Sequence, residues 1–193
     1  MKSSWLSCYR GLPLQVGAFY ALLIGILRRT IFQPTSTTTI ITTLWMGFVL
    51  TISFMEAWVK FRAPFLPRHY ALDVGRTVFP VLNAVEVALC GHLWWTVAKN
   101  SRSLIMATLI LLSQVIYMTP QLVLLGKHVI VHAFASKEPS NWSPSQRDTF
   151  ETLAADVKQT KRPSGKLHIV YVLQELVKVI LLATIVRNFQ TGL

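Results

Sequence analysis

Ionisable and amide side chains recur at helical spacing inside otherwise apolar segments, and such groups can bind protons, ions or cofactors. Spacings of 0, 3, 7 and 10 residues place four side chains on one face of a helix. Two segments have this spacing, one with Arg76, Phe79, Asn83 and Glu86, the other with His168, Tyr171, Glu175 and Lys178. A charge inside a membrane span is costly when unpaired, so these residues indicate structural or functional use.

Two further segments carry shorter polar stripes, Ser53, Glu56 and Lys60 in one and Gln114, Tyr117 and Gln121 in the other. Four helices with one polar stripe each predict a bundle with a polar seam inside. From the rise of about 1.5 Å per residue, we expect Arg76 to meet Glu56 or Glu175, and Lys178 to meet Glu86. The predicted buried network comprises Glu56, Arg76, Asn83, Glu86, His168, Tyr171, Glu175 and Lys178.

Three histidines are candidate ligands for a haem or a chlorophyll magnesium. His128 and His132 are spaced i and i+4, which lets both rings face one metal, and His92 stands beside two tryptophans. No carboxylate or cysteine at matching spacing completes a site, so an interfacial role is the commoner explanation. We predict no resident cofactor and no metal. The sequence also lacks H-E-x-x-H, G-x-S-x-G, phosphate-loop and C-x-x-C-H motifs, so no catalytic residue is predicted.

The elements that must position these residues are long apolar helices. The 193 residues are 52% hydrophobic and 14% charged, whereas soluble domains average about 25% charged residues. The apolar segments are 38–59, 71–97, 104–126 and 167–186, each long enough to span a bilayer. Backbone groups in lipid must bond internally. We therefore predict an all-α polytopic membrane four-helix bundle, with kinks at Pro80 and Pro120.

Residues 1–37 form an N-terminal extension to the four-helix domain 38–186, and residues 187–193 form a short tail. The extension is basic, hydroxylated and free of acidic residues, since Glu56 is the first acidic residue of the chain. That composition is typical of an organellar targeting segment. Its apolar run is too continuous for a simple amphipathic presequence. Residues 11–29 are either a retained fifth membrane helix or part of a removable targeting segment.

The long connection 127–166 contains a predicted amphipathic helix at 144–162. Ser143 is a plausible N-cap, Pro144 suits the first helical position, and Gln146 completes a capping box. One apolar face is formed by Phe150, Leu153, Ala154 and Val157. Such a helix is expected to lie on the membrane surface or to cover the mouth of the bundle.

The formal net charge is +11, from 19 Lys and Arg against 8 Asp and Glu. Most of the basic residues lie in the connections 60–70 and 127–166, among them Lys60, Arg62, Arg68 and Lys137. Cationic loops remain on the cytoplasmic, matrix or stromal side of a membrane, so we place both connections there. Because no basic stripe with interleaved aromatics occurs, nucleic acid is not an expected partner.

The polar positions fall in three motifs, ISFMEAWVKFRAP (52–64), LDVGRTVFPVLNAVE (72–86) and HIVYVLQELVKVILL (168–182). These motifs resemble a family of small uncharacterised four-helix integral membrane proteins of bacterial type. A more distant resemblance is to eukaryotic transmembrane-205-type proteins. The resemblance covers residues 44–186 and implies the topology and the polar seam. It implies no chemistry, and both the N-terminal extension and the basic loop helix depart from the family pattern.

The lack of a catalytic constellation favours a non-catalytic membrane protein. We expect an accessory or scaffold subunit that contacts the bilayer and other subunits of a larger complex, in an organellar (mitochondrial or plastid) or bacterial inner membrane. One alternative is a small transporter or channel that moves protons, ions or a small solute along the polar seam. A second alternative is a haem- or chlorophyll-binding membrane subunit.

Overall fold

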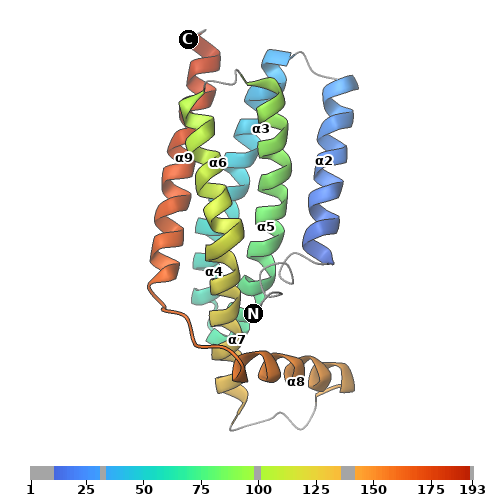
Figure 1. Ribbon diagram of the computed structural model, residues 1–193, viewed down its shortest axis with the longest axis vertical. Helices are drawn as coiled ribbons and strands as arrows, with labels where there is room; N and C mark the ends of the chain where they lie inside the picture. Colours follow the sequence, from blue (N-terminus) through green and yellow to red (C-terminus); the bar gives the residue numbers. More distant parts are fainter. Residues whose placement is uncertain (1–10, 31–33, 98–100, 136–141, 192–193) are drawn as a thin grey trace.

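The computed structural model describes residues 11–30, 34–97, 101–135 and 142–191, and within these ranges all regular structure is helical (Figure 1). The α-helices are α2 (Leu12–Thr30), α3 (Pro34–Val49), α4 (Ala57–Arg62), α5 (Arg68–Thr96), α6 (Arg102–Ser113), α7 (Thr119–Phe134), α8 (Pro144–Lys158) and α9 (Leu167–Thr191). Two π-helical segments, η1 (Leu50–Glu56) and η2 (Gln114–Met118), join α3 to α4 and α6 to α7.

Four continuous helices are long and apolar enough to cross a membrane: Thr37–Arg62, Arg68–Thr96, Arg102–Phe134 and Leu167–Thr191. The prediction of an all-α fold with four helices long and apolar enough to cross a membrane is therefore confirmed. The third helix continues to Phe134, eight residues past its predicted end. At 33 residues it is about 50 Å long, which exceeds the roughly 30 Å of a hydrocarbon core, so it extends beyond the apolar layer.

The π-helical segments change which side chains face the bundle. A π-turn bonds i to i+5 and holds one more residue than an α-turn, so it rotates the residues that follow. In η2, Gln114 and Met118 are buried, whereas Tyr117 is 57% exposed. The predicted stripe of the third span was therefore wrong at Tyr117. Pro120 is the second residue after η2, and a local π adjustment of this kind accommodates the donor that a proline lacks. Helix α5 continues through Pro80.

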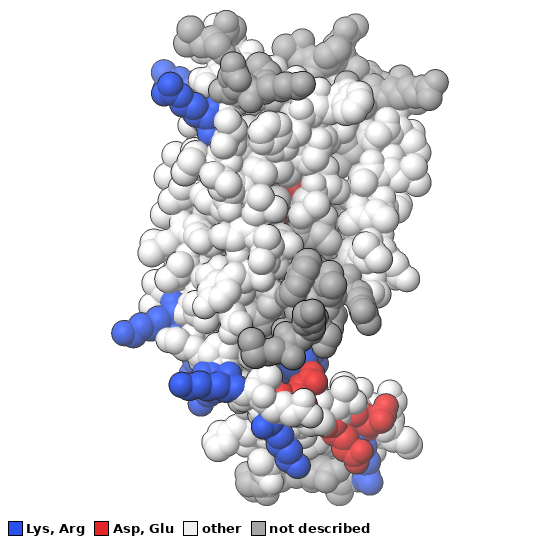
Figure 2. Space-filling model, in the orientation of Figure 1, with Lys and Arg blue, Asp and Glu red and all other residues white. Residues whose placement is uncertain are grey.

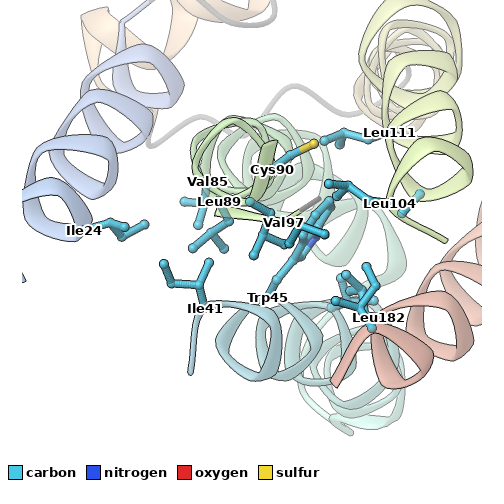
Figure 3. Packing of buried hydrophobic residues seen from close by; sticks show 14 residues of the cluster. Ile24, Ile41, Trp45, Val85, Leu89, Cys90, Val97, Leu104, Leu111 and Leu182 are labelled. Atoms are coloured by element: carbon cyan, nitrogen blue, oxygen red, sulfur yellow. The ribbon is translucent and has the colours of Figure 1, made fainter. Parts of the chain in front are cut away.

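The main apolar core lies in the half of the bundle that is remote from α8. Figure 3 shows Trp45 of α3, Leu89 of α5, Leu104 of α6 and Leu182 of α9 converging there. Trp45, Leu89 and Leu182 are fully excluded from the surface. A second cluster, formed by Phe79, Leu82, Met118 and Tyr171, lies nearer the other end. Glu175 and Lys178, described below, lie along α9 between Tyr171 of the second cluster and Leu182 of the main core.

Helix α2 packs beside α5 (Figure 1). Gly17 makes this possible, because a Cβ at that position would lie 3.1 Å from the Ala84 Cβ and carbonyl oxygen. Small residues permit such close helix approach in membranes. The outer face of α2 exposes Leu14, Phe19 and Leu22. The described helix covers the predicted segment 11–29, whereas residues 1–10 of the extension lie outside the described residues.

Helix α8 lies across one end of the bundle (Figure 1). It begins with the predicted capping box, in which Gln146 N donates to Ser143 Oγ at 3.3 Å and Ser143 N donates to Gln146 Oε1 at 2.9 Å. It ends at Lys158, four residues earlier than predicted. Lys127 of α7 pairs with Asp156 at 2.7 Å, and Leu153 is buried. These contacts join α8 to α7; Lys137, in the connection between them, lies outside the described residues.

Candidate functional site: a buried charge network and a basic cavity

A cluster of three charged side chains lies inside the bundle. Lys178 Nζ on α9 is 2.6 Å from Glu86 Oε1 on α5 and 3.1 Å from Glu175 Oε1, one turn earlier on α9. All three side chains are 0% exposed. The pairing of Lys178 with Glu86, expected from their similar depth, is present.

Two neutral side chains complete what we call the buried network: Trp45, Glu86, Gln114, Glu175 and Lys178. Gln114 accepts a 2.6 Å hydrogen bond from Lys178 Nζ and donates one of 2.8 Å to Glu175 Oε1. Trp45 Nε1 donates to Glu86 Oε1 at 2.7 Å. Gln114 stood in a predicted polar stripe without being assigned to the site. Trp45 was missed, because an isolated tryptophan in an apolar run gives no polar signal.

A second polar layer lies beside the buried network. Asn83 Nδ2 donates to Thr119 Oγ1 at 2.7 Å, and Tyr171 OH donates to Asn83 Oδ1 at 3.3 Å. All three residues are buried. The ring of Tyr171 packs edge-on against Phe79, with centroids 5.3 Å apart. Asn83 and Tyr171 were predicted here, whereas Thr119 was not, because its hydroxyl lacks a helical polar pattern around it.

The charges of the buried network do not balance. Two carboxylates face one ammonium group, and in the described part of the chain no other cation lies within ion-pair distance of either carboxylate. Glu86 Oε2 and Glu175 Oε2 are both buried and accept no hydrogen bond from the described residues. An uncompensated carboxylate in an apolar interior is strongly unfavourable, so the site must gain a positive charge or retain a proton.

Three residues of the predicted network lie outside it. Arg76 pairs with Asp73 at 2.6 Å, and Glu56 pairs with Lys60 at 3.0 Å. The expected contacts of Arg76 with Glu56 or Glu175 were therefore wrong. Asp73 lies one turn from Arg76 on the same helix, and such i,i+3 pairs form without help from tertiary packing. His168 is exposed at the start of α9.

Arg76 and His168 instead border a partly enclosed cavity of about 630 Å³ at the end of the bundle near α8, and so does Lys60, the partner of Glu56. Its walls come from α4, α5, α7 and the segment that leads into α9. We call this the basic cavity, because its lining holds five basic or imidazole side chains and no Asp or Glu. Those five are Lys60, Arg68, Arg76, Arg162 and His168. Phe79 contributes to the cavity wall and also packs against the ring of Tyr171.

The three candidate histidine ligands do not form one cluster. His92 lies near the end of α5, whereas His128 and His132 lie in α7 at the opposite end of the bundle. His128 Nε2 is 3.4 Å from Thr160 Oγ1, and His132 is exposed. Among the described residues, no group of three or more His, Cys, Asp or Glu side chains could hold a metal ion.

Comparisons of the chain with protein-family models, with curated proteins and with solved structures return no match. The resemblance to small four-helix membrane proteins therefore stays a prediction.

Proposed function

We propose that this protein is a small membrane transporter that moves protons along its polar seam, with the buried network as the proton-binding site. The observation that carries the proposal is the unequal charge of that network. Among the described residues, Glu86 and Glu175 share one cation, Lys178, and all three are excluded from the surface. The four long apolar helices around them support a bilayer location.

A proton is the counter-charge that best suits this site. Both carboxylates direct one oxygen at Lys178 and leave the other without a hydrogen bond from the described residues. A proton on either second oxygen neutralises the excess charge and needs no additional space. The interior around it is closely packed, with Tyr171 and Gln114 fully buried, which disfavours a hydrated metal cation.

The polar seam leads toward the basic cavity. Phe79 forms part of the cavity wall and packs on Tyr171, which donates to Asn83. On the other side of the buried network, the apolar core around Leu89, Leu104 and Leu182 closes the bundle. This arrangement supports access to the proton site from the end that carries the basic cavity, with the opposite end closed.

The test is proton flux in liposomes that contain the purified protein and a trapped pH-sensitive dye. A potassium diffusion potential drives protons inward. We expect the wild-type protein to acidify the lumen faster than empty liposomes do. Glu86→Gln keeps the shape of the side chain but leaves Glu175 and Lys178 as a balanced pair, with no excess negative charge to bind a proton. Its rate should therefore fall to that of empty liposomes.

The matched control is Glu151→Gln, which alters an exposed carboxylate on α8 and should transport like the wild type. Circular dichroism and gel filtration establish that both variants are folded. Wild-type flux in a folded Glu86→Gln variant would show that the ion pairs only hold the helices together, and the proposal would then be abandoned.

The hypothesis of an accessory subunit stays a prediction, because no described contact bears on a partner; co-purification from native membranes in mild detergent tests it. The haem or chlorophyll alternative is tested by an absorbance spectrum of the purified protein.

We also propose that α2 is a fifth membrane helix and that α8 lies at the membrane surface. The basic end should face the cytoplasm, matrix or stroma of an organelle or bacterium.

A further inference from the structure

The basic cavity carries more positive charge than its neighbours neutralise. Lys60 and Arg76 each have a carboxylate partner, Glu56 and Asp73. Arg68 and Arg162 also line the cavity, and neither forms an ion pair with a described residue. These two guanidinium groups leave a net charge of about +2 at the cavity, which calls for an anionic ligand.

The rest of the cavity wall is apolar. It includes Phe61, Leu66, Leu72, Leu122 and Val129, from three different parts of the chain. The volume of about 630 Å³ falls within the range of roughly 300–1,000 Å³ that is typical of small-molecule sites. A fully polar anion would leave this wall in contact with water, whereas a molecule with an anionic head and an acyl chain would satisfy both parts.

The position of the basic cavity also indicates a lipid. Figure 2 shows most of the visible Lys and Arg side chains at the end of the molecule near α8, together with acidic ones, and a smaller basic group at the opposite end; the surface between the two ends is almost free of charge. Basic pockets between membrane helices bind anionic headgroups, and guanidinium groups bind phosphate through paired hydrogen bonds. A phosphate monoester carries a charge of about −1.5 to −2, which matches the charge of Arg68 and Arg162, neither of which forms an ion pair with a described residue.

We propose that the basic cavity binds a phospholipid whose headgroup is a phosphate monoester, with the phosphate at Arg68 and Arg162 and one acyl chain along the apolar wall. Neither the site nor its test depends on proton transport. The Lys60–Glu56 and Arg76–Asp73 pairs then flank the headgroup and keep the adjacent wall neutral.

The test uses the purified full-length protein in neutral detergent, without any proton gradient. Dioctanoyl phosphatidic acid, dioctanoyl phosphatidylcholine and inorganic phosphate are titrated separately, and binding is measured by native mass spectrometry. We expect phosphatidic acid to bind at least tenfold more tightly than either of the other probes. Arg68→Gln combined with Arg162→Gln should weaken its binding by about tenfold or more, since charged hydrogen bonds are lost.

Two matched controls distinguish binding in the cavity from two general effects, the loss of basic charge and the addition of a bulky side chain. Lys158→Gln combined with Lys161→Gln removes two exposed cations near the same end but outside the lining, and should change the affinity less than twofold. Val129→Trp fills the cavity and should abolish binding. Ile169→Trp adds the same bulk at a 62% exposed position outside the lining and should leave it intact.

Three results would overturn the proposal. Equal affinity for phosphatidic acid and phosphatidylcholine would remove the role of the monoester charge. Equal affinity for inorganic phosphate would remove the role of the acyl chain. Equal losses in the arginine and lysine double variants would assign binding to the basic end as a whole. Thermal unfolding of each variant shows that it is folded.

Discussion

Lys178 Nζ lies 2.6 Å from Glu86 Oε1, and both side chains are completely excluded from the surface. The two residues belong to the last helix and to α5, so this contact joins distant parts of the chain. The same carboxylate oxygen also accepts the indole hydrogen of Trp45. One oxygen atom therefore connects α3, α5 and α9.

Lys178→Met should lower the free energy of unfolding by about 3–5 kcal/mol, because it leaves buried carboxylates without their cation. Unfolding by sodium dodecyl sulfate in mixed micelles measures the change. Adding Glu86→Gln and Glu175→Gln to this variant should restore much of the loss, since no uncompensated charge then remains. A triple variant as unstable as the single one would contradict this electrostatic explanation.

Trp45→Phe should lower the free energy of unfolding by about 1.5–3 kcal/mol, the usual range for a hydrogen bond to a charged group. The phenyl ring fills much of the same space but cannot donate to Glu86. The same unfolding assay measures it. Trp95→Phe serves as the control, because Trp95 is 79% exposed, and its effect should stay within about 0.5 kcal/mol.

Gly17→Leu should separate α2 from α5, because the side chain would collide with the backbone and Cβ of Ala84. Gly25→Leu is its match on the same helix, since a Cβ there meets no atom within 4 Å. Spin labels on the two helices, read by electron paramagnetic resonance, report their distance. We expect a longer and broader distance distribution for Gly17→Leu and an unchanged one for Gly25→Leu; similar distributions for both would refute the packing role of Gly17.

The proposed orientation can be tested by labelling single cysteines with a membrane-impermeant maleimide in a variant that lacks Cys8 and Cys90. Phe65→Cys and Glu151→Cys should react from the same side, the cytoplasmic or equivalent side, because both lie in the basic connections. Trp95→Cys, near the other end of α5, should react from the opposite side. Labelling of all three from one side would contradict the four-span topology.

The helices, the polar seam and the central ion pair could be predicted from the sequence. Lys178 and Glu86 stand at similar depths on regular helices, so the helical rise per residue was enough to predict their contact. The capping box of α8 was predictable because its residues bond to one another within four positions. In each of these cases, a local geometric rule determines the contact.

The remaining parts of the site depend on features that periodicity does not encode. The π-helical segment η2 turned Tyr117 outward, although helical spacing placed it on the same face as Gln114. Arg76 found a partner on its own helix rather than across the bundle. The basic cavity is formed by side chains of separate elements, so no single sequence motif predicts it.

The long-range pairing of Glu86 has a consequence for biosynthesis. About 90 residues separate it from Lys178, so at translation rates of about 5–20 residues per second Glu86 is synthesised roughly 5–20 s before Lys178. During that interval the carboxyl group of Glu86 lacks its cation, and an apolar environment then favours its protonated form. Because α9 is synthesised last, the ion pair between Lys178 and Glu86 forms only after the other helices of the bundle have been made.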